Sequence, residues 1–146
     1  MKVKIFDLRV FNKDLKKKLH KSLEKILTHG KLFLGPEINQ FEKKISSFTG
    51  VNYAMGVSSG SSALYLALRS SGIGHGDEVI TTPLSWIITT NAIAACNAKP
   101  IFADVQDDFN IDPISIENKI TKKTKAIVPM HYAGHMCDMG KIIKIA

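Results

Sequence analysis

The stretch Gly56-Val-Ser-Ser-Gly-Ser-Ser-Ala-Leu64 carries residue types that bind phosphate. It joins the end of a predicted strand to the start of a predicted helix. The first turn of a helix offers N–H groups without intrahelical partners, at the positive end of the helix dipole, so phosphate fits there. Gly60 lets the backbone approach closely, and the hydroxyls of Ser61 and Ser62 can add hydrogen bonds. An N-cap built of serines needs no ligand, and the local sequence leaves both interpretations open.

Two better-known phosphate motifs do not fit. No Gly-Lys-Ser/Thr follows the serines, so the stretch is not a P-loop. In Gly72-Ile-Gly-His-Gly76 the third glycine comes one residue too early for a dinucleotide fingerprint, and the segment precedes a strand where it should follow one. These glycines indicate the end of one helix and a turn into the next strand.

Trp86, the only tryptophan of the chain, lies where a predicted strand gives way to a helix. In open α/β sheets ligands bind at that edge, so the flat indole is placed to stack on a planar ring. The alternative is a tryptophan buried between helix and sheet.

Two histidines, a thiol and a carboxylate fall within His131-Tyr-Ala-Gly-His-Met-Cys-Asp138 and suggest a metal site. Their spacing matches no familiar zinc pattern, and Gly134 argues against a helical H-x-x-x-H pair. We therefore expect no metal here, and favour a loop on the ligand side of the sheet. Cys96 and Cys137 form no C-x-x-C pair, so two reduced thiols are expected.

The elements that must position these residues follow from hydrophobic periodicity. Two amphipathic helices are predicted first. Asn12 is the N-cap of the first, Pro36 begins the second, Gly50 ends it, and Ile38, Phe41, Ile45 and Phe48 form its buried stripe. Short strands then alternate with helices, which predicts an α/β fold with a parallel-rich sheet flanked by helices. The predicted strands are residues 53–57, 78–81, 99–104 and 125–130, and the helices are 61–71, 85–95, 113–119 and 138 onward.

The formal net charge of +7 lies entirely in the helical part of the chain. Residues 1–50 hold 12 basic and 5 acidic residues, whereas residues 51–146 hold 8 of each. No aromatic residues alternate with the lysines, so we favour a solvated helix face over contact with nucleic acid. Neither a signal peptide nor a membrane span is apparent in the sequence, and a cytoplasmic location is the default expectation.

Together these segments resemble the DegT/DnrJ/StrS family of nucleotide-sugar aminotransferases. The resemblance runs from about residue 31 to the end and rests on the order and spacing of several stretches. They are Phe33-Leu-Gly-Pro-Glu-Ile-Asn-Gln-Phe-Glu42, Ser59-Gly-Ser-Ser-Ala-Leu-Tyr-Leu-Ala-Leu68, Gly72-Ile-Gly-His-Gly-Asp-Glu-Val-Ile80, the Trp86 segment, Lys99-Pro-Ile-Phe-Ala-Asp104, Thr124-Lys-Ala-Ile-Val-Pro129 and His131-Tyr-Ala-Gly134.

The resemblance implies the N-terminal part of the large domain of a fold-type-I transferase that uses pyridoxal phosphate. Residues 1–50 would form an N-terminal helical segment, and residues 51–146 an incomplete cofactor-binding domain. Gly60, Ser61 and Ser62 would hold the cofactor phosphate, although many members carry threonine where this chain has Ser61. Trp86 falls where members place an aromatic that stacks on the pyridine ring. No metal is implied.

The family's activity is transfer of an amino group, typically from glutamate, to a keto-deoxysugar nucleotide. Members pair the pyridine nitrogen with a carboxylate and bind the cofactor aldehyde through a lysine, both expected beyond Ala146. Lys99 and Lys125 are not in the Schiff-base context, so we expect a fragment that is inactive by itself. Its expected partners are a second copy, as in the family's dimers, or a complementing C-terminal half. The alternative is a non-catalytic module that binds a phosphate ligand or regulates a partner.

Overall fold

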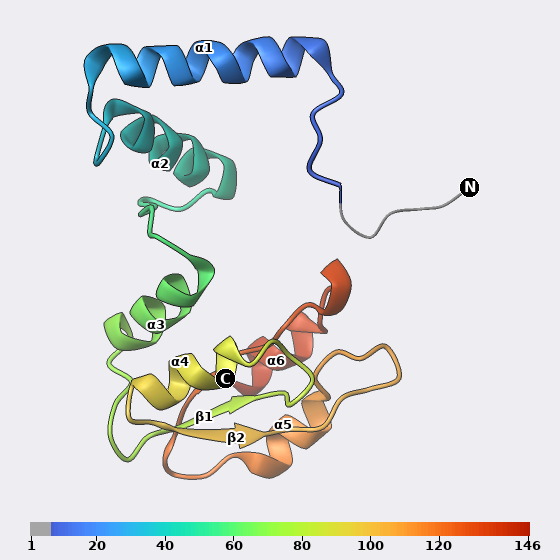
Figure 1. Ribbon diagram of the computed structural model, residues 1–146. Helices are drawn as coiled ribbons and strands as arrows, with labels where there is room; N and C mark the ends of the chain where they lie inside the picture. Colours follow the sequence, from blue (N-terminus) through green and yellow to red (C-terminus); the bar gives the residue numbers. More distant parts are fainter. Residues whose placement is uncertain (1–6) are drawn as a thin grey trace. The chain divides into compact units, whose positions relative to one another are not determined.

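The computed structural model describes residues 7–146, which form two compact units. The first unit ends at Gly56, and the second comprises Val57–Ala146 (Figure 1). The unit boundary therefore falls six residues after the boundary at residue 50 that the sequence favours. Among the described residues, no helix is both long and apolar enough to cross a bilayer.

The first unit contains two helices, α1 (Lys13–His29) and α2 (Pro36–Thr49). The side chain of Asn12 accepts a hydrogen bond from the N–H of Leu15 at 2.9 Å and so caps α1, as the sequence predicts. Gly50 ends α2 with a φ of 74°, a left-handed conformation that glycine adopts without a steric penalty.

Most apolar side chains of these two helices are exposed. Neither α1 nor α2 contains a buried residue, and Phe48 is 88% exposed. The prediction of a buried stripe on α2 is therefore wrong for this chain. Amphipathic periodicity identifies the apolar face of a helix, but it does not by itself bury that face.

The strand predicted over residues 53–57 is also absent. This segment has no ladder partner among the described residues, and Tyr53 and Met55 are exposed. A strand exists only when its N–H and C=O groups pair with a neighbouring strand, so a suitable sequence is not sufficient.

The second unit is an α/β domain built on a parallel sheet, which confirms the predicted fold class. Its strands β1 (Glu78–Thr81), β2 (Lys99–Phe102) and β3 (Thr124–Ile127) are arranged in the order β2-β1-β3, and β1 runs parallel to both neighbours. The last three residues of the central strand are buried, and Val79 and Ile80 have no exposed surface.

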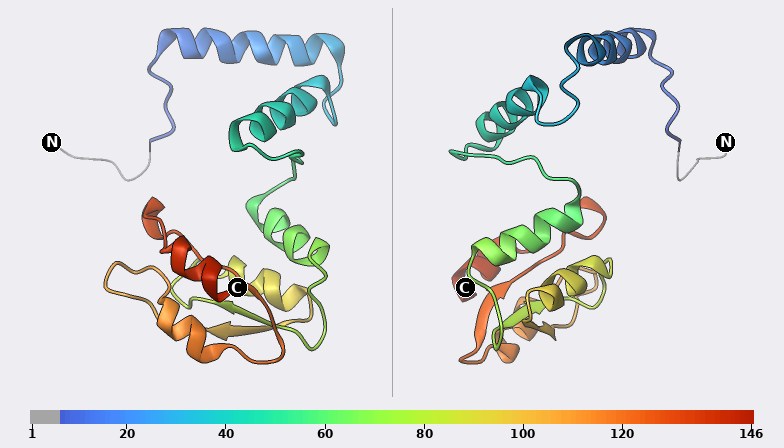
Figure 2. Two further views of the ribbon diagram at one scale, coloured as in Figure 1. Left: turned by 180° about the vertical axis from the view of Figure 1, so that it is seen from behind. Right: turned by 60° about the vertical axis from the view of Figure 1, so that its left-hand side comes forward.

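Helices cover both faces of this sheet because adjacent strand residues point to opposite sides. Val79 belongs to a core cluster with residues of α3 (Gly60–Ser70) and α4 (Ile88–Ala95). Ile80 belongs to a second cluster with residues of α5 (Pro113–Lys119) and α6 (Met139–Ile145). Both views in Figure 2 show α3 and α4 side by side, in agreement with their contacts.

All three strands end at one edge of the sheet because they are parallel. The segments 82–87, 103–112 and 128–138 leave from this carboxyl edge. The C-terminal end of α3 connects through residues 71–77 to the start of β1, at the opposite edge. The N-terminal end of α3 therefore points toward the carboxyl edge, where ligands bind in open α/β sheets.

Candidate functional site

The start of α3 is capped by a cluster of serine hydroxyls. Ser59 is the N-cap, and its Oγ accepts a hydrogen bond from the N–H of Ser62 at 3.1 Å. The hydroxyl of Ser62 lies 3.0 Å from that of Ser58 and 3.1 Å from that of Ser59. The serine N-cap, one of the two interpretations that the sequence left open, is therefore present, and it occupies the N–H of Ser62.

Hydrogen-bonding capacity is still left in this first turn. Within residues 7–146, the N–H groups of Gly60 and Ser61 and the hydroxyl of Ser61 have no hydrogen-bond partner. A Cβ built on Gly60 would meet no heavy atom within 4 Å, so the space beside its backbone is open. These donors, at the positive end of the α3 dipole, are suited to an anion such as a phosphate group.

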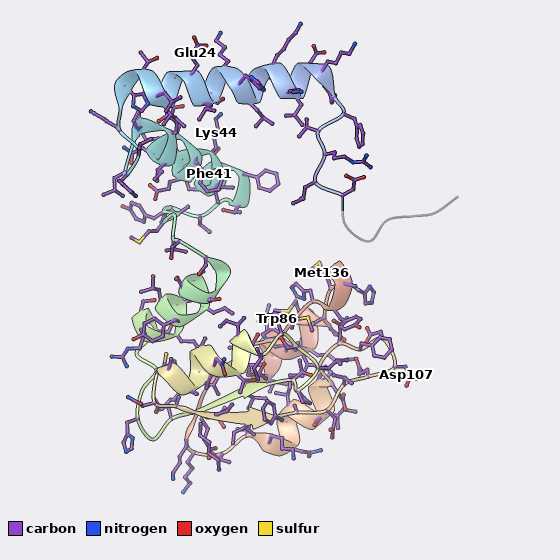
Figure 3. All side chains as sticks on the ribbon, viewed as in Figure 1. Glu24, Phe41, Lys44, Trp86, Asp107 and Met136 are labelled. Carbon is purple, nitrogen blue, oxygen red and sulfur yellow. The ribbon has the colours of Figure 1, made fainter. Side chains whose placement is uncertain are left out.

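Trp86 lies in the segment that leads from β1 into α4, and it is 78% exposed (Figure 3). The alternative of a tryptophan buried between helix and sheet is therefore wrong. The helix predicted from residue 85 begins only at Ile88, so Trp86 precedes it. Its carbonyl accepts the N–H of Thr89 at 3.1 Å, and the Ser85 and Thr89 hydroxyls lie 3.0 Å apart. The backbone around the indole is held while its ring stays accessible.

The predicted site residues lie at the starts of two adjacent helices of the second unit. Gly60, Ser61 and Ser62 open α3, and Trp86 lies just before α4, which packs against α3. Both helix starts point toward the carboxyl edge of the sheet. A shared cofactor site at this edge, formed by these four residues, remains a prediction.

The segment 128–138 is held by local hydrogen bonds. Nδ1 of His131 accepts the N–H of Cys137 at 3.2 Å, and Nε2 of His135 lies 3.2 Å from the carboxylate of Asp108. Hydrogen bonds from the backbone and side chain of Asn110, and then the charge of His135, lower the pKa of Asp108, while burial raises the pKa of the Cys137 thiol. Among residues 7–146, no group of three or more His, Cys, Asp or Glu side chains is arranged to hold a metal ion.

The sequence interpretation missed two parts of this region. A serine N-cap was among the interpretations, but Ser58 and Ser59, which complete the hydroxyl cluster, were not singled out; the preference of helix N-caps for serine points to Ser59. Asn110 is buried and joins the segments after β2 and β3. Nothing in the local sequence predicts that role, because its contacts lie 22 to 27 residues along the chain.

Comparison with known proteins gives a consistent result. A model of the DegT/DnrJ/EryC1/StrS aminotransferase family matches residues 13–146. The spore coat polysaccharide biosynthesis protein SpsC of Bacillus subtilis is 46% identical over 121 residues, which are 82% of this chain and 31% of SpsC. The dTDP-3-amino-3,6-dideoxy-alpha-D-galactopyranose transaminase of Aneurinibacillus thermoaerophilus is 39% identical over 145 residues, which are 99% of this chain and 40% of that enzyme.

Among solved structures, NtdA from Bacillus subtilis with bound cofactor PMP has a TM-score of 0.88 at 38% identity, over 92% of this chain and 31% of NtdA. The chain thus spans 31 to 40% of the length of these three proteins. The free donors at the start of α3 and the exposed indole match what a flat, phosphorylated ring such as this cofactor requires.

Proposed function

The chain belongs to the DegT/DnrJ/EryC1/StrS aminotransferase family, and on that premise we propose that it provides the phosphate-binding part of a sugar aminotransferase. The complete activity would move an amino group, typically from glutamate, onto a keto-deoxysugar linked to a nucleotide, with pyridoxal phosphate as cofactor. The observation that carries this proposal is the first turn of α3, where two N–H groups and one hydroxyl have no hydrogen-bond partner among residues 7–146 and lie near the edge that also bears Trp86.

Each residue has a distinct role in the proposal. The N–H groups of Gly60 and Ser61 and the hydroxyl of Ser61 would donate to the cofactor phosphate. Ser62 would act through its hydroxyl, since its N–H is already bonded to Ser59. Trp86 would cover one face of the pyridine ring. When bound, pyridoxal phosphate supplies the electron sink that amino transfer needs.

We propose further that the chain works with more protein, either a complementing C-terminal half or a second copy. The uncovered apolar side chains of the first unit support this, since Leu23 and Leu27 on α1 and Phe41 and Phe48 on α2 are all more than half exposed. Apolar faces of this kind are normally covered by other protein.

The sole tryptophan provides a direct test of cofactor binding. Pyridoxal phosphate added to the chain should quench Trp86 fluorescence to saturation, and pyridoxal without the phosphate should require a much higher concentration. Ser61→Ala should weaken the binding of pyridoxal phosphate because it removes one donor, by roughly tenfold for a hydrogen bond to a charged group. Equal quenching by pyridoxal and pyridoxal phosphate would contradict the phosphate site.

The chain alone should not transaminate. Lys99 and Lys125 are exposed on strands β2 and β3, and neither lies in the sequence context of the family's Schiff-base lysine. Borohydride reduction in the presence of pyridoxal phosphate, followed by peptide mass spectrometry, should show scattered, substoichiometric labelling. One stoichiometric adduct on a single lysine, or amino transfer from glutamate to a keto-sugar nucleotide, would overturn this expectation. Saturable binding without either reaction would also fit the non-catalytic module.

A further inference from the structure

Asn110 lies in the segment after β2, and its buried side-chain amide forms several hydrogen bonds. The residue is 1% exposed. Its Nδ2 donates to a carboxylate oxygen of Asp108 at 3.0 Å and to the carbonyl of Met136 at 3.3 Å. Its Oδ1 accepts the N–H of Tyr132 at 3.0 Å and lies 3.5 Å from Sγ of Cys137. One amide thus joins the segment 104–112 to both ends of the turn 132–136.

Other contacts between the same two segments surround this amide. The ring centroids of Phe109 and Tyr132 lie 5.1 Å apart, and His135 on the second segment pairs with Asp108 on the first. Phe109 and Ala133 both adopt positive φ values, 66° and 49°, which non-glycine residues rarely adopt. Such conformations persist when surrounding contacts hold them, and here the Asn110 amide bonds to the residue next to each.

We propose that Asn110 is a positioning residue, whose amide fixes the segment 130–138 against the segment 104–112 and so sets the shape of the carboxyl edge. Met136, labelled in Figure 3, and His131 lie exposed on the segment that this amide holds. Without the amide, the Met136 carbonyl and the Tyr132 N–H lose their partner, and the segment 130–138 opens. The importance of this shape for the cofactor rests on the proposed function, but the joining of the two segments does not.

The reactivity of Cys137 reports on whether the segment 130–138 stays in place against the segment 104–112. Its thiol is buried, 3.2 Å from the carbonyl of Met130, so it is protected from reagents while the segment stays in place. Cys96 is equally buried, but it belongs to the other core cluster, on the face covered by α3 and α4. The two thiols therefore separate local opening of the carboxyl edge from unfolding of the whole domain.

The experiment is alkylation of the full chain with iodoacetamide, with the rate at each cysteine followed by peptide mass spectrometry. Asn110→Ala should accelerate labelling of Cys137 by roughly tenfold or more, because it leaves buried groups unpaired, and should leave Cys96 unchanged. Asn118→Ala, on the exposed side of α5, is the matched control and should change neither rate.

Two results would overturn the proposal: no acceleration at Cys137, or equal acceleration at both cysteines, which indicates general destabilisation. If Asn110→Ala does not fold, Asp108→Ala decides the matter. It removes one acceptor of the amide and the partner of His135, and should produce a smaller, equally selective rise at Cys137. The measurement uses no cofactor, so absence of pyridoxal phosphate binding would refute the proposed function and leave this result intact.

Discussion

The serine cluster at the start of α3 allows a stabilising side chain to be separated from a ligand-binding one. Ser59→Ala removes the Oγ that accepts the N–H of Ser62. Loss of such an N-cap costs about 1 kcal/mol, with a range of about 0.5–2 kcal/mol. Because 1.4 kcal/mol corresponds to a factor of about ten, the first turn should open about fivefold more often. Amide hydrogen exchange at Ala63, whose N–H donates to the Ser59 carbonyl, should accelerate by that factor when followed by NMR, and exchange at Ser62, whose N–H loses its acceptor, by at least as much.

Ser61→Ala is the matched control, one position away from Ser62 in the same turn. The Ser61 hydroxyl has no partner in the described part of the chain, so its removal should leave exchange at Ser62 within about twofold of the original rate. The same variant should weaken pyridoxal phosphate binding. The reasoning fails if Ser59→Ala leaves exchange unchanged, or if Ser61→Ala accelerates it equally.

Two further predictions concern the core and the last helix. Ile93→Ala, at a position with no exposed surface, should lower the unfolding free energy of the second unit by about 2–5 kcal/mol, as measured from the slowest-exchanging amides of β1. Ile143→Ala, at a residue 68% exposed, should change it by less than about 0.5 kcal/mol, and similar losses would contradict this core assignment. Asp138 is the N-cap of α6, and hydrogen bonds from the side chain and backbone of Lys141 lower its pKa below the ordinary 3.8. The stabilisation of α6 by the Asp138 carboxylate is therefore present above pH 3.8 and disappears as the pH falls through the lowered pKa. Asp138→Asn should flatten the pH dependence of exchange in α6, and an unchanged profile would show that another group is responsible.

Local sequence determined the parts of this structure that depend on neighbouring residues. Asn12, Pro36 and Gly50 set helix ends, because each acts within one turn of its own backbone. The strand at residues 78–81 and the helix at residues 113–119 have the predicted limits. The helix start near Ser61 was recognisable for the same reason, since a helix start is made by consecutive residues.

Tertiary structure decided whatever requires a second surface. Residues 53–57 have the composition of a strand but form none, because hydrogen bonds between strands need a neighbour. Phe48 on the apolar face of α2 and Trp86 at the sheet edge are both exposed. Hydrophobic periodicity carries no information about what covers a side chain. The position of Asn110 shows the same limit: a buried amide is stable only when its distant partners are in place, and only the folded chain brings Tyr132 and Met136 to it.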